Sequence, residues 1–213
     1  MKPYYEQDGI TIYHGDCLEI MPTLADAGVD LVIADPPYNV GVDYVDHDDD
    51  MPPEAYERWC AEWFLASREL CRTTIVFPGF SRGRLPMWER VQRWSAMGCW
   101  YKPGNFASGH LGGDEWEPWL YWGQRVGGTS VVRATVGKQG DAAGHPCPKP
   151  VKLIELLMVK FKAELVLDPF LGSGTTTKAA QLLGKRAIGI ELSERYCEIA
   201  ARRLEQGVFD LSL

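Results

Sequence analysis

This 213-residue chain lacks long apolar runs, and its beginning lacks the hydrophobic stretch of a secretory signal. A membrane-spanning helix needs about 20 mostly apolar residues, so we expect no membrane segment and a cytoplasmic location. The chain also lacks C-x-x-C pairs, since its six cysteines are scattered. This scatter disfavours a zinc knuckle and a disulfide framework, and we therefore expect no metal and a reducing compartment.

Internal repeats and long linkers are absent too, which favours one domain over residues 1–213. Short apolar runs alternate with helical patterns, as is typical of an α/β protein whose mostly parallel sheet is covered on both faces. We expect strands at 10–13, 31–34, 74–77, 119–122, 165–167 and 187–190. We expect helices at 18–26, 53–71, 82–97, 149–162, 174–184 and 193–206. Residues 103–148, with ten glycines, form the irregular part of the chain.

Basic residues are scarce at the start of the chain, where residues 1–54 hold 13 acids and one base. The net charge of the whole chain is −7, so residues 55–213 carry a surplus of positive charge. Much of it lies in the basic cluster of residues 72–102, which holds Arg72, Arg82, Arg84, Arg90, Arg93 and Lys102 against one acid, Glu89. This cluster is either a solvated helix face or a surface that neutralises nucleic-acid phosphates, and charge alone does not decide between the two.

Residues 164–176 combine a strand that ends in an acid, Asp168, with a glycine-containing turn that opens a helix. Glycines let the backbone approach a ligand closely, and a helix N-terminus favours a negative group. The segment lacks G-x-x-x-x-G-K-[ST] and the full G-x-G-x-x-G fingerprint, which disfavours a nucleoside-triphosphate or dinucleotide site. About twenty residues later Glu191 ends the next expected strand, where a carboxylate can accept both hydroxyls of a ribose. Alone the turn could be a tight connection, but with both acids it predicts a cofactor site.

A second acidic turn, Asp35-Pro36-Pro37-Tyr38, follows the expected strand at 31–34, and its prolines hold the backbone extended. An exocyclic amine of a nucleobase is a poor nucleophile, because its lone pair is delocalised into the ring. The Asp35 carboxylate and the Pro36 carbonyl could accept its N–H groups and aim the lone pair at a methyl donor, while Tyr38 stacks on the extruded base. We expect the Asp35 side chain to be reserved for that amine. The alternative is an ordinary turn with Tyr38 in the core.

Together and in this order, D-P-P-Y at 35–38 and D-P-F-L-G-S-G-T-T at 168–176 resemble the amino-methyltransferases of DNA. The match is to the circularly permuted group, in which the catalytic motif precedes the cofactor loop, and it covers nearly the whole chain. It implies S-adenosyl-L-methionine as the methyl donor and duplex DNA with a flipped base as the partner. It also implies a Rossmann-like sheet of seven strands with one reversed. D-P-P-Y rather than S-P-P-Y favours adenine N6 over cytosine N4.

The resemblance implies roles for particular residues. The catalytic residues are Asp35, Pro36, Pro37 and Tyr38. The cofactor-binding residues are Asp16, Cys17, His145, Lys149, Asp168, Phe170, Gly172, Ser173, Gly174, Thr175, Glu191 and Leu192. Asp16 could instead cap a helix, and Glu117 falls in a segment that the family places on the target-base side. From the basic cluster and the irregular part, the expected nucleic-acid contacts are Arg82, Arg84, Lys102, Phe106 and Trp116, with Trp119 as a further candidate for the base pocket.

Two features depart from the family pattern. Residues 103–144, where the family houses target recognition, are only some forty residues, so specificity is loose, short or supplied by a partner. Five aspartates lie between Asp43 and Asp50, close to where nucleic acid should lie, and a mobile loop or a gate would reconcile this charge. Other functions stay open: methylation of cytosine N4 or of RNA on the same scaffold, or an inactive nucleic-acid-binding subunit. The chain could act as a homodimer or with a partner subunit.

Overall fold

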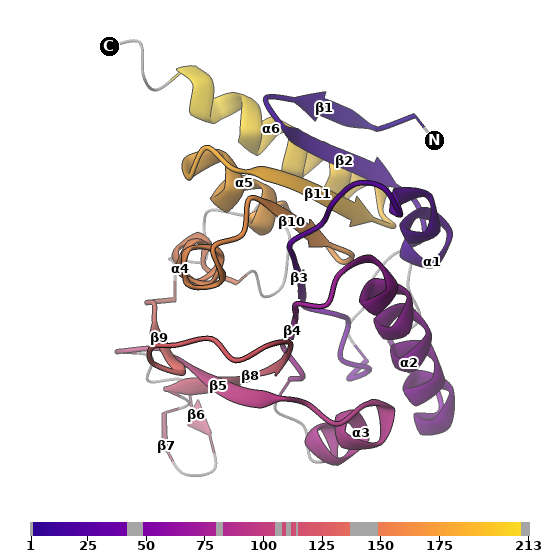
Figure 1. The fold of residues 1–213 in the computed structure, drawn as a ribbon, viewed down its shortest axis with the longest axis vertical. Coiled ribbons are helices and arrows are strands. Elements are labelled where there is room, and N and C mark those ends of the chain that lie inside the picture. Colours follow the sequence, from indigo (N-terminus) through magenta and orange to yellow (C-terminus); the bar gives the residue numbers. More distant parts are fainter. Residues whose placement is uncertain are drawn as a thin grey trace.

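The computed structural model describes residues 2–41, 49–79, 83–104, 108–109, 112–113, 115–136 and 149–209, and the statements below concern these residues. They form an α/β fold with one large sheet (Figure 1). The helices are α1 (Cys17–Ile20), continued by the 3₁₀ turn η1 (Met21–Leu24), α2 (Pro53–Leu70), α3 (Arg84–Val91), α4 (Val151–Phe161), α5 (Thr175–Leu182) and α6 (Glu194–Phe209). The strands are β1 (Tyr5–Gln7), β2 (Ile10–His14), β3 (Leu31–Ala34), β4 (Thr74–Val76), β5 (Ala96–Tyr101), β6 (Ser108–Gly109), β7 (Gly112–Gly113), β8 (Trp116–Trp122), β9 (Val131–Arg133), β10 (Leu165–Asp168) and β11 (Arg186–Glu191).

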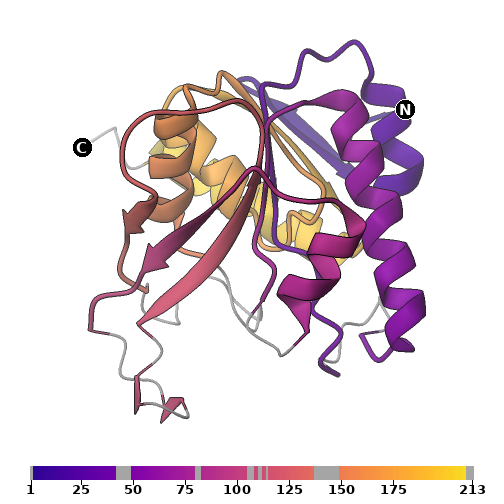
Figure 2. The ribbon, with the colours of Figure 1, turned by 60° about the horizontal axis from the view of Figure 1, so that its bottom comes forward.

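The large sheet has nine strands in the order β1-β2-β11-β10-β3-β4-β8-β5-β9. All neighbours from β2 to β4 are parallel, while β8 runs antiparallel to both β4 and β5. The stretch from β2 to β5 is therefore the expected sheet of seven strands with one reversed. Two short edge strands extend it, since β1 pairs antiparallel with β2 and β9 pairs parallel with β5. The small β6–β7 hairpin lies beyond the ends of β5 and β8 (Figure 2).

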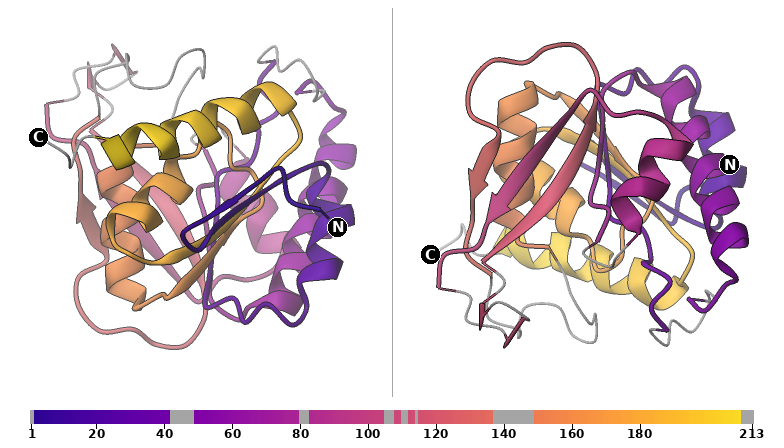
Figure 3. Two further views of the ribbon diagram at one scale, coloured as in Figure 1. Left: turned by 90° about the horizontal axis from the view of Figure 1, so that it is seen from above. Right: turned by 90° about the horizontal axis from the view of Figure 1, so that it is seen from below.

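The two faces of the sheet bury two separate cores. In β3, Leu31 and Ile33 belong to the core under α4, α5 and α6, whereas Val32 and Ala34 belong to the core under α1, α2 and α3. A strand buried on both faces needs apolar residues at successive positions, which explains the unbroken apolar run of β3. Figure 3 shows the two helical layers on opposite sides of the sheet. The fold class expected from the sequence is thus confirmed.

Most expected elements are present with boundaries shifted by a few residues, and the aromatic run at 119–122 is part of β8. The expectation of one helix over 82–97 is wrong, because α3 ends at Val91 and β5 begins at Ala96. Each residue of β5 is paired with a residue of β8, a long-range interaction that local periodicity does not reveal. No helix in the described ranges is long and apolar enough to cross a membrane.

Candidate active site

The acids singled out in the sequence end neighbouring parallel strands. β10 ends at Asp168 and β11 ends at Glu191, while Asp35 directly follows β3. Since β10 lies between β11 and β3, the three carboxylates share one edge of the sheet. After β10 the chain continues into α5 on one face, and after β3 it continues into α2 on the other. This reversal is a topological switch point, where open α/β sheets bind their ligands.

The turn after β10 forms a tight cradle at this edge. Gly172 and Gly174 have φ angles of 54° and 87°, in the region that favours glycine. The Gly172 N–H donates to one Glu191 oxygen at 2.7 Å, and the Ser193 N–H donates to the other at 2.9 Å. A Cβ on Gly174 would lie 2.7 Å from the Cβ of Ala200, so α6 packs directly against the turn. Glycine is therefore required here both for conformation and for space.

Asp168 is buried at the base of the cradle. Its carboxylate accepts a hydrogen bond from the Phe170 N–H at 3.0 Å and from the Thr176 hydroxyl at 2.5 Å. Burial raises the pKa of Asp168 to about 7, although these two donors oppose the shift, and the charges of Asp35 and Glu191 add to it. The charge of the cradle therefore changes near neutral pH.

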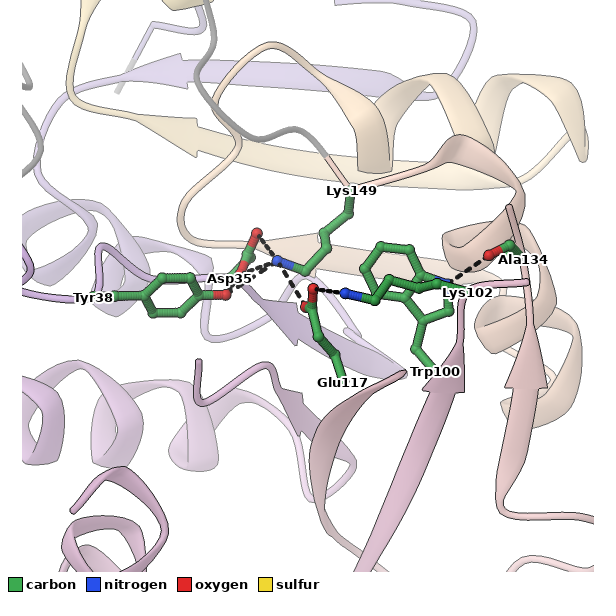
Figure 4. A network of polar contacts seen from close by, with 7 residues as sticks. All are labelled: Asp35, Tyr38, Trp100, Lys102, Glu117, Ala134 and Lys149. Atoms are coloured by element: carbon green, nitrogen blue, oxygen red, sulfur yellow. Dashed lines mark hydrogen bonds and ion pairs between the residues drawn. The ribbon is translucent and has the colours of Figure 1, made fainter. Parts of the chain in front are cut away.

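Asp35 and Tyr38 meet Lys149 in a partly buried polar network (Figure 4). The Tyr38 hydroxyl donates to Asp35 Oδ1. The Lys149 ammonium donates to both Asp35 oxygens, at 2.9 Å and 2.8 Å, and to Tyr38 Oη at 3.1 Å. Burial would lower the pKa of Lys149, but Asp35, Tyr38 and Glu117 hold it well above its usual value, so the group is a cation. Asp35 thus has a partner, Lys149, that the sequence analysis did not predict. A role of Asp35 toward the amine and a contact of Lys149 with the cofactor both stay predictions.

The backbone of the acidic turn is held by two side chains from neighbouring helices. Tyr56 of α2 donates its hydroxyl to the Pro37 carbonyl at 2.8 Å. Arg84, the first residue of α3, donates to the Tyr38 carbonyl, and its guanidinium carbon lies 4.4 Å from the centroid of the Tyr56 ring. Among the described residues none donates to the Pro36 carbonyl. Sequence reasoning missed Tyr56, because nothing in its helical pattern distinguishes it from a core aromatic.

One of the five aspartates after this turn has a structural role. Asp49 is only 4% exposed, and its carboxylate accepts from the N–H groups of Asn39 at 2.6 Å and Val40 at 3.0 Å. The Asn39 side chain exchanges hydrogen bonds with the Met51 backbone, which fixes the same connection. The hypothesis of a mobile loop or gate falls on residues 42–48, outside the described residues.

Asp16 and Cys17 follow β2, which neighbours β11 in the sheet. Asp16 is the N-cap of α1, and its side chain accepts from the Leu18 N–H at 2.8 Å. The alternative that Asp16 caps a helix is thus confirmed. A contact of Asp16 with a cofactor stays a prediction. Cys17 is buried in the core under α1, and burial raises the pKa of its thiol to about 12.

The other residues assigned to the cofactor also lie near the cradle. Phe170 packs against two tryptophans of α2, with ring centroids 4.9 Å and 5.5 Å apart. Ser173 and Thr175 are buried, and the Ser173 carbonyl accepts from an arginine of α6 at 2.6 Å. Leu192, by contrast, is 39% exposed. His145 lies outside the described residues.

Two members of the basic cluster point into the protein. Lys102 is 5% exposed, and its ammonium pairs with Glu117 at 2.8 Å. Arg84 is engaged with the acidic turn. The expectation of a phosphate contact is therefore corrected for Lys102, because a buried, paired ammonium does not form part of an exposed surface. Arg90 and Arg93 stay exposed, each paired with a glutamate, at 2.5 Å and 3.6 Å.

The aromatic candidates separate in the same way. Trp116, at the start of β8, is 48% exposed and accessible to a ligand. The hypothesis that Trp119 lines a base pocket is wrong, because Trp119 is 3% exposed and packs against Phe161 of α4. The start of β8 is exposed, whereas its residues from Pro118 onward are buried on both faces, so the position along the strand decides which tryptophan is accessible. Arg82 and Phe106 lie outside the described residues.

The fold and the order of the strands are those of a class, the Rossmann-like methyltransferases. A sequence profile described as DNA methylase matches residues 89–202, more than half of the chain. No group of three or more metal-ligating side chains occurs in the part of the chain that the structure describes.

Known proteins agree with this class. YubD of Escherichia coli (strain K12), a methylase by name, is 31% identical over 212 residues, which cover 89% of this chain and 88% of YubD. The Type II methyltransferase M.ScaI of Streptomyces caespitosus is 25% identical over 265 residues, covering 96% of this chain and 84% of M.ScaI. The PvuII DNA methyltransferase, described as cytosine-N4-specific, has a similar fold, with a TM-score of 0.73, 17% identity and coverage of 95% and 88%. The chain belongs to the DNA methylase family of S-adenosylmethionine-dependent amino-methyltransferases, and S-adenosyl-L-methionine is its methyl donor.

Proposed function

We propose that this chain methylates the exocyclic N6 of adenine in DNA, on a base flipped out of the duplex. The observation that carries the proposal is the position of Asp35, which follows β3 beside the cradle after β10. An amine held at Asp35 would face a methyl donor held on the neighbouring strand. Such positioning is a large part of what an enzyme contributes to a two-substrate reaction.

The acidic turn can hold an amine through two acceptors. The Asp35 carboxylate would accept one N–H, and the Pro36 carbonyl would accept the other, which localises the lone pair on the nitrogen. Tyr56 and Arg84 engage the two carbonyls that follow, so the turn is pre-organised before a base arrives. The Tyr38 ring would stack on the extruded base, as aromatic side chains do in proteins that bind unpaired bases.

The residues of the cradle fit S-adenosyl-L-methionine. Gly172 and Gly174 bring the backbone close to a ligand, and Glu191 at the end of β11 suits the ribose hydroxyls. Bound at this edge, the cofactor supplies an electrophilic methyl group on a cationic sulfur. The carboxylates of Asp35, Asp168 and Glu191 lie at the same ends of three neighbouring strands and would favour a cation bound there. The chemistry of the donor set thus agrees with the cofactor of the family.

Adenine is favoured over cytosine by the aspartate that opens D-P-P-Y. Cytosine N4 is the second candidate, because the fold is shared with the PvuII enzyme, which is described as specific for that atom. RNA offers the same amines. An inactive subunit is disfavoured, since it would have no chemical need to keep both the acidic turn and the cofactor turn. A homodimer or a partner subunit stays a prediction that light scattering of the purified protein can test.

The test is incubation of the purified chain with labelled S-adenosyl-L-methionine and plasmid DNA, or with RNA in parallel, followed by nucleoside analysis. N6-methyladenine in DNA is the expected product. N4-methylcytosine would contradict the proposed base and support the second candidate, and label in RNA alone would contradict the proposed polymer. A folded protein that binds the cofactor and transfers no label would support the inactive-subunit hypothesis.

A further inference from the structure

The Lys149 ammonium occupies the place that the proposed chemistry gives to the target amine. Its nitrogen lies 2.9 Å and 2.8 Å from the two Asp35 oxygens and 3.1 Å from Tyr38 Oη. These three contacts use all three N–H donors of a lysine. Only 8% of the Lys149 side chain is exposed, so solvent does not compete for it. Both oxygens of the catalytic carboxylate are therefore engaged before DNA arrives.

This arrangement opposes methyl transfer. As the new bond to nitrogen forms and the bond from methyl to sulfur breaks, positive charge moves onto the nitrogen of the base. A lysine cation on the same carboxylate competes for the acceptor and repels the developing charge, and this repulsion is stronger in a buried site than in water. Lys149 must therefore leave Asp35, at least in part, before the reaction.

A second acceptor lies within reach of Lys149. Glu117 Oε2 is 3.8 Å from the Lys149 nitrogen, and the other oxygen, Oε1, already accepts from Lys102 at 2.8 Å. Lys102 is fixed in turn, with its nitrogen 5.3 Å from the centroid of the Trp100 ring, and the Trp100 indole donates to the Ala134 carbonyl at 2.8 Å (Figure 4). Glu117 thus presents one oxygen toward Lys149 from a well-supported position.

We propose that Lys149 is a positioning residue, which occupies the acceptor site of Asp35 in the absence of DNA and transfers to Glu117 when the target amine enters. After the transfer, each oxygen of Glu117 binds one ammonium group, and Asp35 accepts from the amine and from Tyr38. The anion at Asp35 then lies next to the nitrogen on which positive charge develops. The proposal rests on the proposed function only in that an exocyclic nitrogen is the methyl acceptor.

Base capture measures the first half of this proposal directly. The methylated site is first located in DNA modified by the wild-type protein. The target base is kept, with its exocyclic amine, and 2-aminopurine replaces the base next to it, so that its fluorescence rises when the target base leaves the stack. Lys149→Met removes the occupant and should increase the affinity for this DNA by about tenfold, together with the signal of the flipped base, if the acceptor is open in about a tenth of the wild-type molecules. Lys149→Arg keeps a cation, which can form two hydrogen bonds to the Asp35 carboxylate. The Arg variant should therefore lower both the affinity for DNA and the fluorescence signal.

The second half requires Glu117. Glu117→Gln should leave Lys149 on Asp35 and lower kcat/KM for DNA by about tenfold, with unchanged affinity for the cofactor by calorimetry. Adding Lys149→Met to this variant should restore most of the loss, because no cation then blocks Asp35. A purely structural role of Glu117 predicts no such rescue. Glu117→Gln also leaves Lys102 without its carboxylate partner. Lys102→Met, added to Glu117→Gln, is therefore the matched control, and it should not restore kcat/KM.

Three outcomes would overturn the proposal: base capture unchanged in Lys149→Met, the same direction of change in the Met and Arg variants, or a double variant as impaired as Glu117→Gln. Circular dichroism and thermal unfolding establish that each variant is folded. If Lys149→Met does not fold, Lys149→Arg still decides, because base capture that is unchanged or increased in the Arg variant would overturn the proposal. Because the assay uses whichever base the wild type methylates, failure of the adenine proposal leaves this test intact.

Discussion

Two groups compete for the Asp35 carboxylate. The proposed chemistry needs its carboxylate open toward an amine, whereas the Lys149 ammonium, with 8% of its side chain exposed, needs an anion beside it. Removing one partner of a buried ion pair typically costs about 3–5 kcal/mol, because the other charge stays unpaired. A change of Asp35 alone therefore lowers stability as well as activity, and the two effects must be separated.

Asp35→Ala combined with Lys149→Met separates them. No cation is left unpaired in this variant, so thermal unfolding and cofactor affinity should stay close to those of Lys149→Met alone. Methyl transfer should fall about a hundred- to a thousand-fold, because one pre-organised acceptor at the reacting atom is worth about 3–4 kcal/mol of barrier. Asp26→Asn, at an exposed position, is the control and should keep full activity. Transfer at the rate of Lys149→Met would show that Asp35 is not the acceptor.

Asp168 makes stability depend on pH. Burial raises its pKa from 3.8 to about 7, so between these values the folded protein binds more protons than the unfolded chain. Stability from this group is present at low pH and is lost as the pH rises from about 4 to about 7. Asp168→Asn removes the titration while an amide oxygen can still accept from the Phe170 N–H. Urea unfolding over a pH series should show wild type losing stability relative to the variant within this window. A difference that does not change with pH would contradict the raised pKa.

At the scale of the elements, α5 has a glycine at each end, and the two differ in one respect. Gly174 before the helix and Gly184 after it have φ angles of 87° and 62°, so alanine is strained at both, by about 1–2 kcal/mol. A Cβ at Gly184 meets nothing within 4 Å, whereas at Gly174 it would lie 3.0 Å from the Ala200 backbone. Gly174→Ala should therefore cost about 1–3 kcal/mol more in unfolding free energy and weaken cofactor binding. Equal effects of the two changes would show that α6 yields at this contact.

The same scale shows what sequence can predict. The strand ends at Asp35, Asp168 and Glu191 were predictable, because apolar runs, prolines and glycines mark them locally. The strand β5 was not, because its pairing with β8 and β9 is what selects an extended conformation. Nor was the bond from Lys149 to Asp35, which joins residues 114 positions apart in the chain. The positive charge of a lysine does not reveal which distant carboxylate it will contact.

At the scale of the whole molecule, binding of DNA must overcome a net charge of −7. Affinity for nucleic acid rests on neutralised phosphates, so the local distribution of positive charge matters more than the total. Arg84 and Lys102 are engaged within the protein and are not available to phosphates in this arrangement. Arg93 is the better candidate, since 88% of its side chain is exposed and its glutamate partner is 3.6 Å away.

Salt dependence of DNA binding tests this assignment. If the surface around α3 faces the phosphates, Arg93→Ala should weaken binding to all sequences and reduce the slope of log K against log salt by about 0.9. Arg202→Ala on α6 is the control, because Arg202 is also exposed and also paired with a glutamate four residues away, but lies on the opposite face of the sheet. Arg84→Ala should leave the slope unchanged and lower methyl transfer, since the guanidinium supports the Tyr38 carbonyl rather than a phosphate. Equal slopes for wild type, Arg93→Ala and Arg202→Ala would show that Arg93 contacts no phosphate and belongs to a solvated helix face. A reduced slope for Arg84→Ala would mean that α3 rearranges when DNA binds.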